Sequence, residues 1–388
     1  MTRRTLLTLP CLLAVLLTPT VVMAAEGKDA PGSFPTAGGP HPDAVALFVS
    51  GDLMIHAADL LAATHQLLQP KTLIGTTAVS VVAGAREVEE QRAVAMWAGK
   101  FAGTVSAVRL EARQTLDRGV EIDELPDVNA HTLILLADPF TFPAELAVDS
   151  WSASHPELQV IGGLASGANA PNGNRFLLDD QIHDTGAVGF LIGGRTHVEP
   201  LVSQGCRPVG SPLIVTSAEG NLVRELGGKP ALRRLEEMFN GLSENEQLLV
   251  NQGLHIGRVI DEHQVDFGTG DFLIRAVMGA DQRTGSLAIG DHPPVGSTVQ
   301  FQVRDAESAD QDLRLMAEPI SAAEGALLFT CNGRGSHLFE DPDHDAAIIA
   351  DLVRQEAVAG MFCAGEIGPV GTRSFLHGFT ASAALFRD

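Results

Sequence analysis

The chain has 388 residues, of which 45% are hydrophobic and 19% are charged. This length allows two domains with sizeable cores, and the composition is typical of a globular protein rather than a disordered one. The formal net charge of -22 would repel nucleic acid and anionic membranes, so neither is expected as a partner.

The first 24 residues have the layout of a secretory signal peptide. Arg3 and Arg4 form a basic start, residues 6–22 are apolar, and Ala24 ends a small-residue cleavage site. The two arginines also resemble a twin-arginine export signal, which predicts an exported, periplasmic protein. An uncleaved anchor and a misplaced start codon are the alternatives. Beyond this leader no apolar run approaches the roughly 20 residues that span a bilayer, so no transmembrane span is expected in the mature chain.

Residues 25–43 are rich in glycine, proline and alanine without periodicity, which is typical of a flexible linker. After this linker, one pattern occurs three times: an apolar strand, a polar loop, a helix, a second strand that ends in small residues, and a third strand. The expected helices lie near 57–68, 143–154 and 345–356. The expected strands are Ala46–Val49, Thr72–Thr77, Ala93–Ala98, Thr132–Leu136, Val160–Ser166, Ala187–Ile192, Ala326–Thr330, Ala359–Gly365 and Phe375–Phe386.

This alternation predicts an α/β protein with two domains, in which mixed β-sheets are covered by helices and built from repeated β-α-β-β units. The extra strand in each unit argues against a wholly parallel sheet. Between the second and third copies, Gly227-Gly228 marks a domain junction, and a helix is expected at Pro230–Asn240. The elements expected after it are strands at Leu254–Ile260, Phe272–Val277, Ser286–Ile289 and Thr298–Arg304, and a short helix at Asp310–Ala317.

Standard catalytic and cofactor motifs are absent, so no cofactor or metal is expected. Residues 341–345 start like a calcium loop, but Ala346 and Leu352 stand where that loop needs glycine and glutamate. Capping of the following helix by Asp343 or Asp345 is the better interpretation. Three histidines have a spacing to the cysteines that fits no zinc pattern: His337, His344 and His377.

The segment from Val358 to Thr380 is the strongest candidate for a site. It is predicted to form a buried strand, a glycine-dense loop with Glu366 and Arg373, and a second strand. Glycine lets the backbone approach a ligand closely, and a segment built only for packing would not need so many polar and reactive groups. The alternative is a buried strand–turn–strand that carries a free thiol in the core.

Two further loops, 203–210 and 330–335, each place a cysteine beside an arginine. A guanidinium lowers the pKa of a thiol and can bind a carboxylate, although both arginines could equally be surface turn residues. Cys11 lies in the leader, and the three remaining cysteines form no disulfide framework. The candidate ligand-binding residues are Cys206, Arg207, Cys331, Asn332, Arg334, Cys363, Glu366, Arg373 and His377.

The chain resembles the FIST family of sensory proteins, which have an N-terminal and a C-terminal FIST domain. The matching stretches occur in the family order: IGGLASG, VSQGCRPVG, GDHPPVGSTVQFQVRDAESADQDL, ALLFTCNGRG and FCAGEIGPVG, followed by FLHGFT. The resemblance implies an N-terminal domain at 44–227 and a C-terminal domain at 228–370, completed by a C-terminal strand in 371–388. It also implies a cytoplasmic location, in contrast to the leader, and binding of small ligands such as amino acids for signal transduction.

The first functional hypothesis is therefore a small-ligand-binding sensory protein, in which arginine holds a carboxylate and Glu366 an ammonium group. Because no output domain is attached, the signal would pass to a separate signalling protein. The second hypothesis is a cysteine-dependent enzyme in which Cys363 or Cys331 attacks a carbonyl or acyl substrate, with His377 as base. The third is an adaptor or structural protein, which predicts a large exposed apolar patch and no polar pocket.

Overall fold

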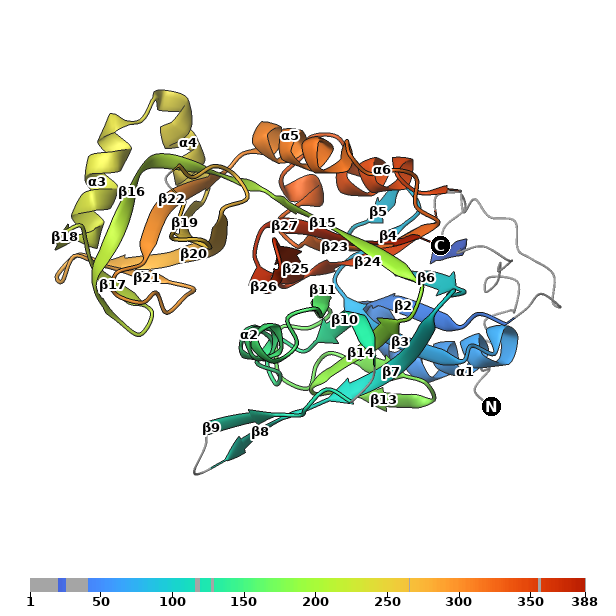
Figure 1. The fold of residues 1–388 in the computed structure, drawn as a ribbon. Coiled ribbons are helices and arrows are strands. Elements are labelled where there is room, and N and C mark those ends of the chain that lie inside the picture. Colours follow the sequence, from blue (N-terminus) through green and yellow to red (C-terminus); the bar gives the residue numbers. More distant parts are fainter. Residues whose placement is uncertain are drawn as a thin grey trace, which may run out of the picture.

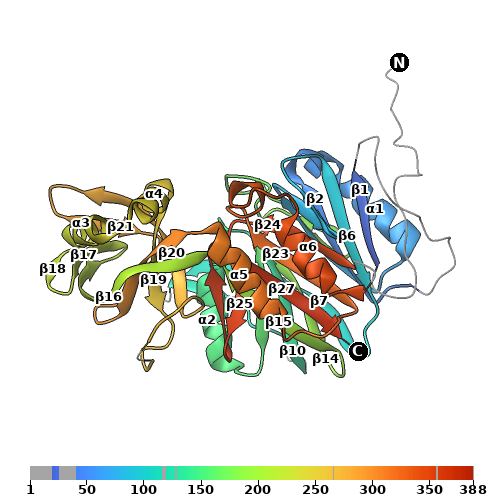
Figure 2. The same ribbon diagram turned by 90° about the horizontal axis from the view of Figure 1, so that it is seen from above.

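The computed structural model describes residues 20–25, 41–115, 119–126, 129–264, 266–354 and 357–387. The predicted leader and linker lie outside this part, apart from 20–25 and 41–43. Three six-stranded mixed sheets form the body of the molecule, and a seven-stranded sheet lies beside it (Figure 1 and Figure 2). The α/β fold with mixed sheets, helices and two domains is confirmed.

The strands of the body are listed here sheet by sheet. The first sheet has the order β1-β6-β2-β3-β12-β13, with β1 Thr20–Ala25, β2 Ala44–Ser50, β3 Thr72–Ala78, β6 Ala93–Gly99, β12 Phe176–Leu178 and β13 Gln181–His183. The second has the order β26-β25-β11-β10-β14-β7, with β7 Thr104–Leu110, β10 Ala130–Ala137, β11 Gln159–Leu164, β14 Ala187–Gly193, β25 Glu366–Val370 and β26 Arg373–His377. The third has the order β15-β27-β23-β24-β4-β5, with β4 Val81–Ala83, β5 Arg86–Val88, β15 His197–Gln204, β23 Gly325–Cys331, β24 Val358–Cys363 and β27 Thr380–Arg387.

Each body sheet is built around the same three strands. A central strand pairs in parallel with the strand that follows its helix, and antiparallel with the third strand of the unit. The sets are β2 with β3 and β6, β10 with β11 and β14, and β23 with β24 and β27. These are the three predicted repeats.

The repeats exchange strands with one another. The hairpin that follows the second strand of each unit joins another unit's sheet: β4–β5 pairs with β24, β12–β13 with β3, and β25–β26 with β11. The outer strands continue this arrangement, since β7 pairs with β14, β15 with β27, and β1 with β6. No repeat therefore completes its sheet without strands from elsewhere in the chain.

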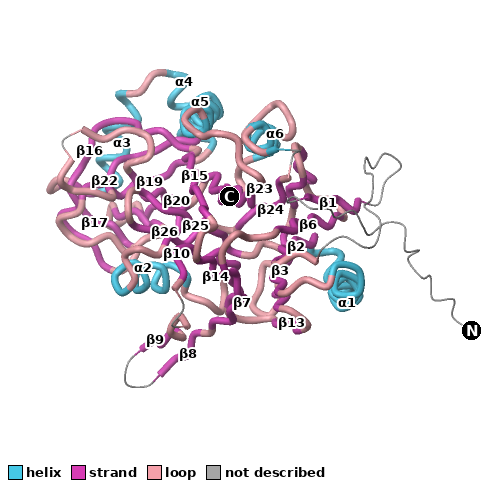
Figure 3. Tube along the Cα trace, turned by 45° about the vertical axis from the view of Figure 1, so that its right-hand side comes forward, coloured by secondary structure: helices cyan, strands magenta, loops and turns pink. Residues whose placement is uncertain are grey.

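The largest apolar core lies between the three body sheets and draws on all of them, as the burial of Phe48, Ile134 and Phe329 shows. The helices cover the outer faces, as Figure 3 shows. Helix α1 (Ala57–Leu68) packs on the first sheet and α2 (Ala144–Ser154) on the second, while α5 (Ala306–Ala317) and α6 (His344–Asp351) pack on the third. Strands covered on both faces explain why the apolar runs are nearly continuous in the sequence.

The fourth sheet has the order β16-β22-β19-β20-β21-β17-β18. An additional pairing of β17 with β16 closes six of these strands into a ring. Helices α3 (Ala231–Gly241) and α4 (Glu244–Gln252) cover it. Its strands are β16 Cys206–Glu219, β17 Leu222–Leu226, β18 Lys229–Pro230, β19 Leu254–Val259, β20 Phe272–Asp281, β21 Ser286–Ile289 and β22 Thr298–Arg304, and a separate hairpin is formed by β8 Ala112–Thr115 and β9 Gly119–Ile122.

Two predicted loops are strands. Residues 203–210 run from the end of β15 through Gly205 into the long strand β16, which leads from the body into the fourth sheet. The predicted glycine-dense loop after β24 is the hairpin β25–β26, because Gly371 adopts a φ of 60° in a tight turn that lets the flanking residues pair. The last predicted strand, Phe375–Phe386, is divided between two strands, since β26 ends at His377 and β27 begins at Thr380.

The capping prediction is confirmed in position but not in its hydrogen bond. The N-cap of α6 is Asp343, but its side chain makes no capping hydrogen bond and instead accepts one from the backbone N–H of Glu87. Asp345 binds a buried arginine instead. Helix α4 was not predicted, although Ser243 and Glu246 form a complete capping box at its start.

Candidate functional site

The buried centre of the candidate site is an ion pair between Arg334 and Asp345. Arg334 follows the turn after β23, Asp345 lies in the first turn of α6, and both side chains are completely buried. Nε of Arg334 lies 2.7 Å from Oδ2 of Asp345, and Nη2 lies 2.8 Å from Oδ1. Burial alone would raise the pKa of Asp345, but the charge and hydrogen bonds of Arg334 outweigh it, so the pKa is lowered.

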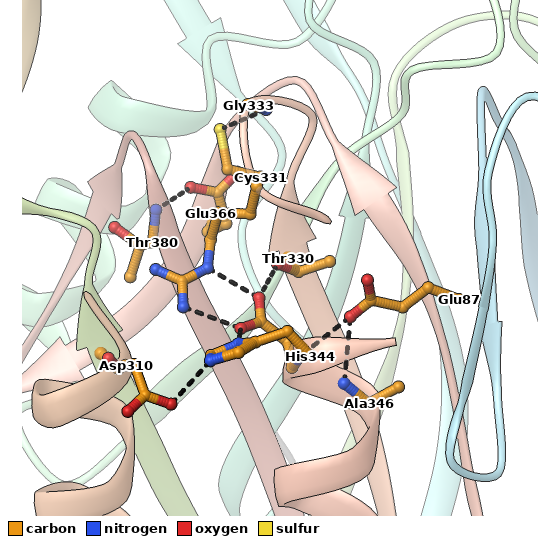
Figure 4. A network of polar contacts seen from close by, with 12 residues as sticks. Glu87, Asp310, Thr330, Cys331, Gly333, His344, Ala346, Glu366 and Thr380 are labelled. Carbon is orange, nitrogen blue, oxygen red and sulfur yellow. Dashed lines mark hydrogen bonds and ion pairs between the residues drawn. The ribbon is translucent and has the colours of Figure 1, made fainter. Parts of the chain in front are cut away.

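A polar network holds this ion pair in place, as Figure 4 shows. The Thr330 hydroxyl donates to Asp345 over 2.6 Å, and the ring of His344 bridges Asp345 and Asp310. The carboxylate of Glu87 accepts the backbone N–H of Asp345 over 2.9 Å. Glu87 comes from strand β5 of the first repeat, so the exchanged hairpin helps to hold α6 in place.

Glu366 and Cys331 lie beside the buried arginine. Oε2 of Glu366 accepts the backbone N–H of Thr380 over 3.0 Å. The sulfur of Cys331 accepts the backbone N–H of Gly333 at 3.4 Å. Burial raises the pKa of Glu366 to about 8.

Several buried polar atoms at this place have no hydrogen-bond partner. They include Oε1 of Glu366, Nη1 of Arg334 and Oδ1 of Asn332. Across the boundary with the fourth sheet, Nδ1 of His255 and both amide atoms of Gln302 are also without a partner. Because most buried polar groups in proteins are hydrogen-bonded, these atoms make the region a candidate site.

Phe379 lies beside His255 of the fourth sheet. Its φ of 62° is a strained, left-handed conformation for a bulky residue. Its ring lies 4.1 Å from the ring of His255, and the guanidinium of Arg304 lies 5.7 Å from its centre. Its backbone carbonyl accepts the N–H of Gly205 over 2.7 Å. The strained conformation thus lets one residue contact the body and the fourth sheet together.

A separate cavity of about 130 Å³ lies between α2 of the body and β19, β20 and β26. Its lining combines two acidic residues, two arginines and an apolar wall: Glu145, Asp149, Arg258, Arg373, Ile260, Leu273, Phe375 and Leu376. Arg258 is held by Asp291 at 2.8 Å, whereas Nη2 of Arg373 lies 3.7 Å from Oδ1 of Asp149. Burial raises the pKa of Asp149.

The structure brings five of the nine predicted site residues together. Cys331, Asn332, Arg334 and Glu366 form one cluster, and Cys363 joins it as the parallel cross-strand partner of Cys331. These residues gather because the adjacent strands β23 and β24 end at the same edge of the third sheet. Cys206 lies nearby in a small core with Phe379.

Of the other three predicted residues, Arg207 and Arg373 lie elsewhere, and His377 is the cross-strand partner of Glu366 in the hairpin β25–β26. Arg207 forms ion pairs with Asp305 and Glu246 at the surface. Arg373 lines the cavity, and Nε2 of the buried His377 lies 2.9 Å from the carbonyl of Gly368. Burial lowers the pKa of His377 to about 4.

Several residues of these sites were not predicted from the sequence. Asp345 was assigned to capping, and Asp149 was one of two acidic residues on a predicted helix. Phe379 carries a detectable signal, since it follows a glycine in the HGFT stretch of the strongest candidate segment. Among the described residues, no group of three or more His, Cys, Asp or Glu side chains is arranged to hold a metal ion. No described helix has the length and apolar character needed to cross a membrane.

Comparison with known proteins places these features in a family. The FIST N domain model matches residues 43–229, and the FIST C domain model matches residues 231–369. The chain belongs to the FIST family. FIST domains are recognised as sensory-type domains.

Two relatives carry no assigned function. The chain is 46% identical to an uncharacterized protein of Mycobacterium bovis over 340 residues, which cover 86% of this chain and 87% of that protein. It is 44% identical to an uncharacterized protein of Mycobacterium tuberculosis over 377 residues, which cover 95% of this chain and 97% of that protein.

Proposed function

We propose that this FIST protein senses a small ligand that carries a carboxylate and an ammonium group, such as an amino acid, and that the ligand binds in the cavity beside α2. The observation that carries the proposal is the lining of the cavity, where arginines and carboxylates surround an apolar wall. A volume of about 130 Å³ is close to the roughly 150 Å³ of an engineered cavity that binds benzene, so the ligand has on the order of six non-hydrogen atoms.

Arg373 is the proposed carboxylate-binding residue. Its ion pair with Asp149 is long at 3.7 Å, and its guanidinium lies 5.5 Å from the centre of the Phe375 ring, which orients it. An arginine fork without a close partner can bind both oxygens of a carboxylate. Asp149 is then the acceptor for the ammonium group, a role that the sequence analysis gave to Glu366.

The position of the cavity supports a sensory role. Asp149 comes from the matched FIST N region and Arg258 from the FIST C region. A ligand that contacts both would favour one arrangement of the body relative to the fourth sheet. The ligand can change the free-energy difference between the two arrangements by no more than the difference between its binding free energies for them. A separate signalling protein would then recognise the favoured arrangement.

Arg373→Met tests the proposal, with Arg233→Met as the matched control because Arg233 is an exposed arginine on α3, remote from the cavity lining. A thermal-shift screen of amino acids and small acids should find a stabilising compound. At a ligand concentration one hundred times Kd, binding adds about 2.7 kcal/mol to the free energy of unfolding. We expect Arg373→Met to weaken binding at least tenfold and the control to leave it unchanged. A screen without any stabilising compound, or unchanged binding by Arg373→Met, would count against the proposal.

The two other hypotheses fit the structure less well. An adaptor predicts no polar pocket, whereas this cavity is lined by charged side chains. The enzyme hypothesis with His377 as base has no geometric support, because the described hydrogen bond of the His377 ring goes to a backbone carbonyl rather than to a cysteine.

A further inference from the structure

We propose that the body and the fourth sheet are two hinged domains, and that the ion pair between Glu145 and Arg275 is the latch that holds them closed at the cavity beside α2. Glu145 lies on α2 of the body, and Arg275 lies on β20 of the fourth sheet. The hinge and the latch are inferred from contacts at the boundary between the domains, whereas their role in sensing rests on the proposed function.

The hinge consists of two neighbouring points where the chain crosses between the body and the fourth sheet (Figure 2). The chain enters the fourth sheet through Gly205, between β15 and β16, and returns through Asp305, between β22 and α5. Cys206 and Arg304, the next residues inside the fourth sheet, pair with each other. The backbone N–H of Asp305 lies 3.5 Å from the carbonyl of Gly205. Residues at the ends of elements, placed side by side in this way, have the geometry of a hinge between domains.

The latch lies at the cavity rather than at the hinge. Nη2 of Arg275 lies 2.7 Å from Oε1 of Glu145, and Glu145 also lines the cavity. Among the described residues, one other ion pair joins the segment 206–304 to the rest of the chain, and this pair, Arg207–Asp305, lies at the hinge itself. Opening about the hinge would therefore break the Glu145–Arg275 pair and keep the other.

Little apolar core crosses the boundary between the two domains. In the part of the chain that the structure describes, the large apolar clusters lie either wholly in the body or wholly in the fourth sheet. A small cluster does cross it, because Phe379 of the body packs against a group that includes Phe272 and Ile274 of β20. Domains joined without a large apolar interface are expected to move relative to each other.

Unpartnered polar atoms near the boundary reduce the free energy needed to open it. Both amide atoms of Gln302 and Nη1 of Arg334 lack a hydrogen-bond partner, although both side chains are completely buried. Water that enters on opening would supply the missing hydrogen bonds. Phe379 keeps its strained φ of 62° while its carbonyl accepts the N–H of Gly205 at the hinge. The closed arrangement therefore carries unfavourable terms that the latch helps to offset.

The place of the cavity connects this motion to the ligand. Arg373 and Asp149 lie on the body side of the cavity, and Arg258 lies on the fourth-sheet side. A ligand that contacts both sides adds to the contacts of the closed arrangement and so raises its population. Opening about the hinge would expose the cavity for entry and release of the ligand.

Distances between spin labels, measured by double electron–electron resonance on the full chain, test the hinge. Ser150→Cys on α2 and Met278→Cys on β20 place exposed thiols on the two domains, and the native cysteines of the described chain are buried, so the label should attach to the introduced thiols. We expect one main distance and a minor, longer one. Ser150→Cys with Ile55→Cys is the control pair, because both positions lie on the body, and it should give a single distance.

The latch is tested by Glu145→Gln, which should raise the fraction of the longer distance at least threefold. Glu324→Gln is the matched control, since it breaks an ion pair with Arg354 inside the body, and it should leave that fraction unchanged. Equal fractions in Glu145→Gln and the wild type, or an equal response to Glu324→Gln, would overturn the proposal. If Glu145→Gln does not fold, the wild type in concentrated sodium chloride decides, because salt screens a partly exposed pair and should also favour the longer distance.

A second arm adds L-alanine, an amino acid small enough for the cavity. It should lower the fraction of the longer distance at least threefold. Stabilisation of the protein by L-alanine in a thermal-shift assay, with the distances unchanged, would overturn closure by a ligand and leave binding in the cavity intact. A response to Glu145→Gln combined with no effect of L-alanine in either assay would support the hinge and count against the proposed function.

Discussion

Removing the charge of Arg334 should destabilise the protein strongly. Arg334→Met deletes both hydrogen bonds to Asp345 and leaves a completely buried carboxylate without its cation. Breaking a buried pair in this way costs about 3–5 kcal/mol. Asp345 keeps its hydrogen bonds from Thr330 and with His344, whose pKa is raised by its contacts with Asp345 and Asp310 despite burial. We therefore expect the low end, about 3 kcal/mol.

A double-mutant cycle in urea unfolding checks this reasoning. Arg334→Met combined with Asp345→Asn removes both charges, so the double variant should be less destabilised than the sum of the single variants by at least about 1 kcal/mol. The exposed pair Arg354–Glu324 is the control, and Arg354→Met should cost less than about 1 kcal/mol. Additive costs within about 0.5 kcal/mol would show that the two buried charges do not stabilise each other.

Four other substitutions have effects whose direction is set by the structure. The pKa of Glu366 is raised from 4.5 to about 8, so protonation of this carboxyl stabilises the folded protein. This contribution to the free energy of unfolding is fully present below pH 4.5 and is lost as the pH rises through about 8. The urea midpoints at pH 5 and pH 8.5 should therefore differ less in Glu366→Gln than in the wild type. Gly360→Ala should greatly lower the thermal midpoint, because its Cβ would lie 1.8 Å from the backbone carbonyl of Leu328. Gly371→Ala, at a φ of 60° with open space, should cost only about 1–2 kcal/mol in the same assay, and equal effects would contradict the argument. Ser243→Ala removes the capping box of α4 and should cost about 1 kcal/mol in urea unfolding; no loss would mean that this helix end contributes nothing.

Local patterns made the three repeats predictable. Strands such as Ala44–Ser50 are buried along their whole length, so their sequence is a continuous apolar run bounded by polar loops. The helix at Ala57–Leu68 ends where its apolar periodicity ends. The pairing of β25 with β11 had no such signal, because it joins residues near 162 and 367 that are distant in the chain.

The candidate site was predictable in part for the same reason. Cys331 and Glu366 each lie in a short glycine-rich segment directly after a buried strand, so parallel pairing of those strands brings them together. Arg207 has a similar local sequence, but the chain is extended there and its side chain reaches two acidic residues at the surface. The role of Asp345 depends on a buried arginine eleven residues earlier, whereas an acidic residue in the first turn of a helix most often serves that helix alone.

The exchange of strands among the three body sheets also sets the order in which the chain can fold during synthesis. Strand β27 lies between β15 and β23, and so the third sheet cannot close until residues 380–387 have left the ribosome. Until then, the edges of β15 and β23 that pair with β27 in the finished sheet are exposed. Exposed strand edges can associate with other chains. Contacts that join distant parts of a chain also form slowly. Chaperones that bind exposed strands should therefore be needed until residues 380–387 have emerged and paired.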